Sequence, residues 1–119
     1  MNELIKKTRA CMEYLGIINP QTGRHPGNTD DERFRDWREA VYSDPEFLYE
    51  GNYITCYWEC RDKEIKTLTN DEVRGCITFL LRQMRCEYPP YPCLDSGELL
   101  AYLDRWIELN NHTDEEENA

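Results

Sequence analysis

The chain has 119 residues, 39% of them hydrophobic, and 24 Asp and Glu outnumber 14 Lys and Arg to give a formal net charge of −10. This length is typical of one domain, and the apolar content is enough for a core, which excludes a wholly disordered protein. The negative charge excludes direct nucleic-acid binding through clustered Lys and Arg, because phosphates would be repelled.

The first predicted element is a helix over residues 2–15. Apolar side chains recur along it at three- and four-residue steps, and Gly16 follows as a C-terminal stop. Cys11 lies on the apolar face and is interpreted as a small core residue. Residues 17–28 contain two prolines and two glycines, so they are predicted to form a long, mobile, irregular loop.

Two helix starts are predicted in the next segment. Thr29 and Glu32 fit the two ends of a capping box, which predicts a second helix beginning there. Ser43 and Glu46 repeat this pattern, which predicts the start of a third helix. Residues 53–62 have the composition of a strand but also fit a helical face, so both assignments stay open.

Two apolar helices, residues 71–86 and 97–109, are predicted to form the centre of the core, because each carries an apolar stripe that needs covering. A capping box at 69–72 opens the first of them. The predicted fold class is therefore all-α: a single-domain bundle of about five helices over residues 1–112. An acidic tail, residues 113–119, is predicted to be disordered.

The six cysteines are interpreted as reduced thiols in a cytoplasmic protein, because the start of the chain lacks an export signal. One alternative is a four-thiolate zinc site formed by Cys56, Cys60, Cys86 and Cys93. Six residues separate the second pair, whereas structural zinc sites usually have about two to four between paired ligands. We therefore predict no metal and no other cofactor, with Cys76 buried in the core.

Catalytic motifs are not evident. The two histidines, His25 and His112, lie in the irregular loop and beside the tail, and the sequence has no Gly-rich phosphate loop, zinc-protease motif or EF-hand pattern. We therefore predict that the protein is not an enzyme. The alternative is a thiol-based enzyme or redox protein in which nearby arginines lower the pKa of Cys86 or Cys93.

Those arginines are Arg82 and Arg85. Our preferred interpretation of them is structural: they offset the dipole at a helix C-terminus, or they form an ion pair with Asp95 or Glu98. The alternative is contact with an anion.

Acidic and aromatic residues are the candidate partner-binding groups. Removing the four acidic residues of the tail still leaves a charge of −6 on residues 1–113. Such a charge favours a basic protein surface as the partner, and we predict neither direct nucleic-acid binding nor a membrane segment. The residues assigned to this contact are Asp30, Asp31, Glu32, Asp36, Glu39, Tyr88 and Tyr91.

Several short motifs follow one another in the second half of the chain. They are Asp44-Pro45-Glu46-Phe47, residues 53–58, the helix over 72–86 and Asp95-Ser96-Gly97-Glu98-Leu99-Leu100. In this order, over about residues 44–109, the chain resembles a small all-helical family of unknown function found in bacteria and their phages. That family shows an Arg-x-Glu-Arg-Phe-like motif at the end of an aliphatic helix, which Gln83, Met84 and Cys86 alter here. The resemblance implies an all-helical fold and a bacterial or phage setting, but no activity.

Together these features predict a non-catalytic, acidic protein-binding module. In its narrow form, the hypothesis is a phage or mobile-element protein that inhibits a host nucleic-acid-handling defence complex. Its acidic face would act as a nucleic-acid mimic and occupy a basic groove. The alternatives are the thiol-based enzyme or redox protein and a zinc-stabilised structural domain.

Overall fold

A computed structural model describes residues 2–49, 51–88 and 91–118, and these residues form helices and no strands. The single-domain, all-α fold predicted from the sequence is therefore confirmed. The elements are α1 (Asn2–Leu15), α2 (Glu32–Ser43), α3 (Tyr53–Cys60), the short 3₁₀ helix η1 (Ile65–Thr67), α4 (Asn70–Met84), α5 (Pro92–Asp95) and α6 (Glu98–Asn118).

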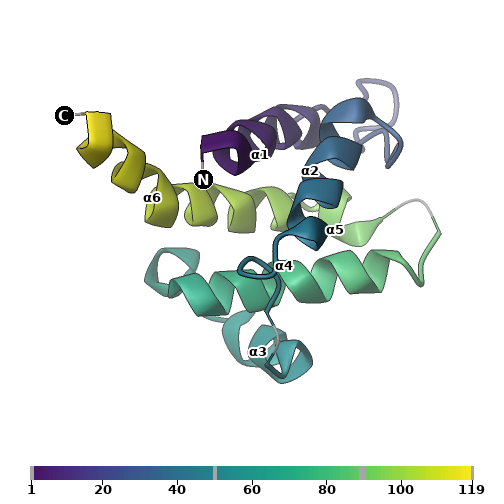
Figure 1. Ribbon diagram of the computed structural model, residues 1–119. Helices are drawn as coiled ribbons and strands as arrows, with labels where there is room; N and C mark the ends of the chain where they lie inside the picture. The colour runs from purple at the N-terminus through teal and green to yellow at the C-terminus, as the bar shows by residue number, and fades with distance from the viewer. Residues whose placement is uncertain (1, 50, 89–90, 119) are drawn as a thin grey trace.

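The longer helices stack in the order α1, α6, α4 and α3 (Figure 1). The central helix α6 packs against α1 on one side and α4 on the other, and α2 packs on α1. The short helix α3 lies at the outer edge, where its packing partner is α4. Within the described residues, every helix is too short or too polar to cross a lipid bilayer.

The centre of the core is the contact between α4 and α6, as the sequence predicts. Apolar stripes at three- and four-residue steps bury each other there, because each helix presents one apolar face. The side chains that are at most 2% exposed in this contact are Val73, Cys76, Ile77, Leu80, Leu99, Leu103 and Trp106.

Capping side chains set where two of the helices begin. At α4, the Thr69 hydroxyl accepts from the Glu72 backbone N–H at 3.2 Å, and the Glu72 carboxylate accepts from the Thr69 N–H at 2.9 Å. This is the predicted capping box. At α2 the predicted cap, Thr29, is wrong, because Asp31 is the N-cap and accepts from the Arg33 N–H at 2.9 Å. A carboxylate lies closer to the free N–H groups and also suits the helix dipole.

The predicted helix start at Ser43 is also wrong. Residues 45–47 form a turn, in which the Asp44 carboxylate accepts from the Glu46 N–H at 2.9 Å. This local hydrogen bond offers the backbone an alternative to a helix. The helix begins only at Tyr53, where Asn52 is the N-cap, so the open choice between strand and helix is settled as helix over Tyr53–Cys60.

The loop over residues 17–28 is irregular, as predicted, but it is tied to two helices. His25 is only 5% exposed. Its Nε2 lies 2.9 Å from the Tyr14 carbonyl oxygen, and its Nδ1 accepts from the Gly27 N–H at 2.9 Å. The His25 backbone N–H also donates to Asp95 at 3.2 Å. His25 therefore anchors the loop to α1 and α5.

At the other end of the chain, α6 is helical through Asn118. Its backbone therefore includes residues 113–118, for which the sequence predicts a disordered tail. Glutamate is a good helix former, and this segment continues a helix whose first half is held by the core. Residue 119 lies outside the described residues, and the domain boundary at residue 112 stays a prediction.

Gly75 explains how α3 lies so close to α4. A Cβ atom at this position would lie 2.5 Å from the Cys56 Sγ and 3.1 Å from the Cys56 Cβ. The first distance is shorter than any ordinary contact, so a larger residue would push α3 outward. The glycine therefore lets the two helix backbones approach each other next to Cys56.

Candidate functional site

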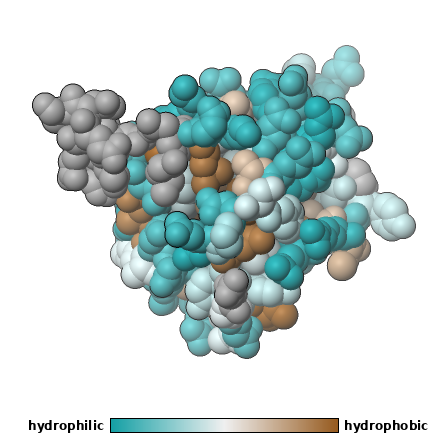
Figure 2. Space-filling view, viewed as in Figure 1, coloured by the Kyte–Doolittle hydropathy of each residue, from teal (hydrophilic) through white to brown (hydrophobic). Residues whose placement is uncertain are grey.

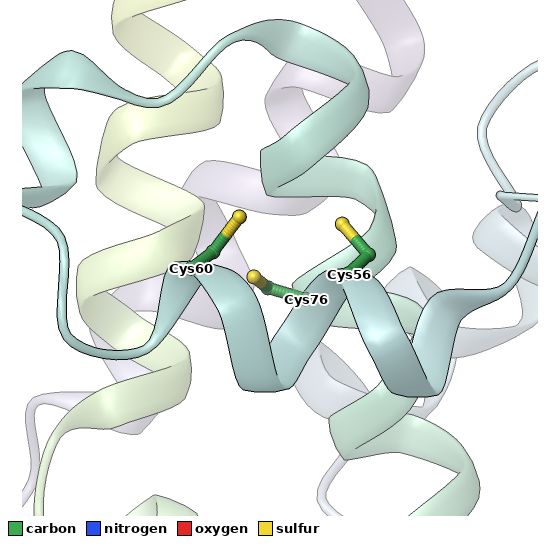
Figure 3. A group of neighbouring side chains, drawn as sticks. All are labelled: Cys56, Cys60 and Cys76. Carbon is green, nitrogen blue, oxygen red and sulfur yellow. The ribbon is translucent and has the colours of Figure 1, made fainter.

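Three cysteine side chains meet between α3 and α4. Cys56 and Cys60 are four residues apart on α3, so they share one face of the helix, and Cys76 reaches the same space from α4 (Figure 3). The three sulfur atoms all lie within 4.8 Å of one another. Cys60 and Cys76 are buried and Cys56 is half-buried. We call these three residues the thiol cluster.

The carboxylate of Glu72 lies beside the thiol cluster. The Cys60 thiol donates to Glu72 Oε2 at 3.3 Å, and Lys63 Nζ lies 3.0 Å from the same oxygen. The hydrogen bond from the Thr69 N–H and the ion pair with Lys63 lower the pKa of Glu72 to about 2. This group is therefore a carboxylate at neutral pH, placed one helical turn before Cys76.

Burial keeps the thiols protonated. It raises the pKa of Cys76 to about 12 and also raises the pKa of Cys56 and Cys60, with the Glu72 carboxylate adding to the effect at Cys60. A protonated thiol is a poor nucleophile. The arrangement therefore does not favour nucleophilic catalysis by the thiol cluster.

Solvent reaches the thiol cluster from one side. A pocket of about 290 Å³ opens onto it, lined by Tyr49, Asn52, Thr55, Cys56, Glu59, Cys60 and Glu72. Carboxylates at this opening attract cations and repel anions. A cation therefore has an entry path to the sulfur atoms.

Of the four cysteines considered from the sequence as a zinc site, the structure brings only two together. Cys56 and Cys60 belong to the thiol cluster, but Cys86 is exposed and Cys93 is buried, and neither is a member. Cys76 takes part instead. Its position on an apolar stripe indicated a core residue, which it also is, and nothing in the spacing shows that α3 packs across it.

The arginines after the apolar stripe of α4 contact aromatic rings. The Arg82 guanidinium lies 5.0 Å from the centre of the Tyr53 ring, and that of Arg85 lies 4.5 Å from the centre of the Tyr42 ring. Among the described residues, neither forms the ion pair with Asp95 or Glu98 that the sequence suggested.

The thiol of Cys93, considered as the nucleophile of a thiol-based enzyme, is not activated, because burial raises its pKa to about 12.

The outer face of α3 exposes large apolar side chains. Ile54 is 50% exposed and Trp58 is 54% exposed, and they lie four residues apart on one side of the helix. In the space-filling view the surface is mostly hydrophilic, and hydrophobic atoms appear in several places, one of them the lower edge, where α3 lies (Figure 2). Arg61 covers part of the Trp58 ring, with 4.8 Å between its guanidinium carbon and the ring centre.

The acidic residues assigned to partner binding divide into two groups. Asp31 pairs with Arg33 at 3.1 Å, and Asp36 lies 4.0 Å from Arg35. These two carboxylates are therefore partly neutralised on their own helix. The remaining three are exposed to solvent: Asp30, Glu32 and Glu39.

The two aromatic residues assigned to partner binding lie in different environments. Tyr88 is 89% exposed, in agreement with a contact role, whereas Tyr91 is 9% exposed and belongs to the core. Tyr88 is therefore accessible to a partner, whereas the burial of Tyr91 does not agree with its assignment to the contact. The exposed residues on α3 were not assigned to partner binding, because residues 53–62 had no settled secondary structure.

A second pocket, of about 310 Å³, lies between α2 and α4. Three of its lining side chains are apolar and five are polar or charged, and the full set is Thr29, Phe34, Arg38, Tyr42, Leu81, Met84, Arg85 and Tyr91. The Tyr42 hydroxyl is buried, with no hydrogen-bond partner among the described residues. Two arginines beside an unpaired hydroxyl would suit a small anion with an apolar body.

The resemblance over residues 44–109 implies an all-helical fold, and the fold agrees with that implication. Its bacterial or phage setting stays a hypothesis. Comparisons of the chain with protein-family models, curated proteins and solved structures give no match. The assignment of a function therefore rests on side-chain geometry.

Proposed function

We propose that the protein is a non-catalytic binding module that contacts a basic protein through the outer face of α3. The observation that carries this proposal is the exposure of Trp58 and Ile54 on one side of a short helix. Burying their exposed portions against a partner would contribute on the order of 3 kcal/mol. That amount is comparable to the contribution of one interface hot spot.

Trp58 is also held in place before any partner binds. Its ring makes edge contacts with Tyr57 and Phe79, at centroid distances of 5.4 and 6.1 Å. Tyr57 in turn stacks on Phe79 at 4.0 Å, which fixes α3 to α4. A rigid aromatic side chain loses little conformational entropy on binding, and Trp, Tyr and Arg are enriched in interface hot spots. This set of side chains therefore supports a docking role.

The net charge of −10 selects the class of partner. A strongly acidic protein attracts basic surfaces over several ångströms and repels acidic ones, which raises the rate of association with a basic partner. The partner we propose has a positively charged surface around an apolar pocket that accepts Trp58. Arg61 lies over the Trp58 ring and Arg82 over the Tyr53 ring.

In its narrow form, this proposal is that the chain is a phage or mobile-element protein that inhibits a host nucleic-acid-handling defence complex. Exposed carboxylates such as Asp30, Glu32 and Glu39 would compete with phosphates for the Lys and Arg of the partner. Support for this form comes from charge alone. Displacement of a labelled DNA or RNA from the purified partner tests it, and a partner that keeps its nucleic acid when bound rules out this form.

The experiment for the general proposal compares two exposed apolar residues. The wild-type chain, Trp58→Ala and the control Ile18→Ala are immobilised, and any captured protein is purified and titrated by calorimetry at two salt concentrations. Ile18 is a suitable control because it is 51% exposed in the loop after α1. Thermal melting of each variant checks that the fold is retained.

We expect Trp58→Ala to weaken binding by about tenfold or more, which corresponds to about 1.4 kcal/mol. Binding by Ile18→Ala should equal that of the wild type, and added salt should weaken every complex. A partner that binds Trp58→Ala as tightly as the wild type, or a complex indifferent to salt, contradicts the proposal.

A further inference from the structure

The thiol cluster has the donor atoms of a zinc site at nearly the required spacing. In a tetrahedral site with Zn–S bonds of about 2.3 Å, two sulfur ligands lie about 3.8 Å apart. The three sulfurs here are within 4.8 Å of one another. Side-chain rotations that move the sulfur atoms by about 1 Å would therefore bring the three sulfurs to this spacing.

The carboxylate of Glu72, which accepts a hydrogen bond from Cys60, is the candidate fourth donor, and its side chain must rotate toward the other two sulfurs to reach the metal. A tetrahedral zinc with one oxygen ligand at about 2.0 Å places that oxygen about 3.5 Å from each sulfur. Glu72 Oε2 already lies 3.3 Å from Cys60 Sγ. The donor set contains three soft sulfurs and one carboxylate oxygen, which suits zinc and disfavours calcium or magnesium.

We propose that Cys56, Cys60, Cys76 and Glu72 bind one zinc ion between α3 and α4. Binding converts Zn²⁺, three thiols and one carboxylate into a complex of charge −2 and releases three protons, so charge and atoms balance. Lys63, 3.0 Å from the Glu72 oxygen, partly offsets that negative charge. The ion enters through the pocket lined by Glu59 and Glu72.

The consequence of zinc binding is a fixed position for α3. This helix has only eight residues, and a helix that short is not stable by itself in water. A metal that joins two of its side chains to α4 would hold it against the core. The site is independent of the proposed docking role, although both involve α3.

Cobalt serves as the probe, because Co²⁺ bound to thiolates absorbs in the near ultraviolet and, when tetrahedral, in the visible. The full-length chain is reduced, stripped of metal with a chelator and titrated with Co²⁺ and then with Zn²⁺. The test variants are Cys56→Ser, Cys60→Ser and Glu72→Gln. The matched controls are Cys86→Ser, an exposed cysteine outside the cluster, and Cys93→Ser, a buried one.

We expect one tetrahedral Co²⁺ per chain in the wild type and in both controls, with displacement by one equivalent of Zn²⁺. Cys56→Ser and Cys60→Ser should each bind more than about 100-fold more weakly, and Glu72→Gln about tenfold more weakly with altered visible bands. Cys56 is half-buried, so its variant should still fold even if that of Cys60 does not.

Three results would overturn the zinc site. The first is a reduced, folded wild-type chain that shows no thiolate–cobalt absorption. The second is Cys56→Ser with wild-type affinity. The third is mass spectrometry of the freshly isolated chain that finds a disulfide within the thiol cluster and no metal, because such a bond removes two of the ligands.

Discussion

Glu72 has several roles at the start of α4. Its carboxylate closes the capping box with Thr69, pairs with Lys63 and accepts from the Cys60 thiol. A group with three such partners is held in one rotamer, and its charged form is favoured over its protonated form. The lowered pKa of Glu72 is the thermodynamic consequence of these contacts.

That pKa predicts how stability depends on pH. The pKa of Glu72 is about 2 in the folded chain, below its ordinary value of 4.5. Its contribution to stability is therefore fully present above pH of about 4.5 and is lost as the pH falls from there toward 2. We expect Glu72→Gln to lower the free energy of unfolding at pH 7 by about 1 kcal/mol, a modest figure because Lys63 is half exposed.

Urea unfolding of the metal-free chain at pH 7 and pH 3 measures this difference. At pH 3 the gap between Glu72→Gln and the wild type should narrow, since the carboxylate is largely protonated in the unfolded chain. Glu39→Gln is the control, because Glu39 is an exposed acid on α2. A gap that stays constant or widens in acid is the opposite of what the contacts predict.

At the scale of elements, a helix could be predicted from the sequence where one apolar stripe along it, or one capping box at its start, is enough to identify it. The periodicity of α1, α4 and α6 and the capping box at Thr69 were sufficient for those helices. The start of a helix at Ser43 was predicted wrongly, because the Asp44 side chain forms a turn instead. The thiol cluster was half predicted: Cys56 and Cys60 follow from helical spacing, whereas Cys76 joins them only through packing between helices.

The loop over residues 17–28 is predicted from its composition to be mobile. Its prolines and glycines indicate irregular backbone, and the backbone is irregular. The contacts of His25 with Tyr14 and Asp95 join residues 11 and 70 positions apart in sequence. The composition of the loop alone cannot predict contacts between residues so far apart in sequence.

Substitution of Gly75 tests how the packing of α3 on α4 depends on their close approach. Gly75→Ala places a methyl group 2.5 Å from the Cys56 sulfur and 3.1 Å from the Cys56 Cβ, so the Cys56 side chain must rotate and α3 must give way by a few tenths of an ångström. Overpacking of this kind costs about 1–3 kcal/mol. We expect that loss in the unfolding free energy, together with a lower affinity of the thiol cluster for Co²⁺.

Gly16→Ala is the control, because a Cβ there meets nothing closer than 3.6 Å. Denaturant unfolding and the cobalt titration are run on both variants. Equal stability and equal cobalt affinity for Gly75→Ala and the wild type would show that α3 does not depend on the close approach.

At the scale of the whole molecule, two properties are not explained by the needs of folding. The first is the net charge of the chain, which is −10. The second is the outer face of α3, where the apolar side chains of Ile54 and Trp58 are half exposed. Charge controls which partners approach, and the exposed face controls which of them stay bound. The function we propose needs both, and neither property is required for a helical bundle to fold.

The three tryptophans allow a direct test of the docking face. Trp37 is 0% exposed and Trp106 is 2% exposed, so Trp58 is the tryptophan that a soluble quencher can reach. Acrylamide quenching of tryptophan fluorescence therefore reports on the outer face of α3. The measurement is made on the chain alone and on its complex with the captured partner, with corrections for tryptophans of the partner.

We predict that one of the three tryptophans is readily quenched in the free chain and becomes protected in the complex, with its emission shifted to shorter wavelength. Trp58→Phe should remove the quenchable fraction from the free chain. If the complex forms while Trp58 stays as accessible to acrylamide as before, α3 is not the docking element and the account is contradicted.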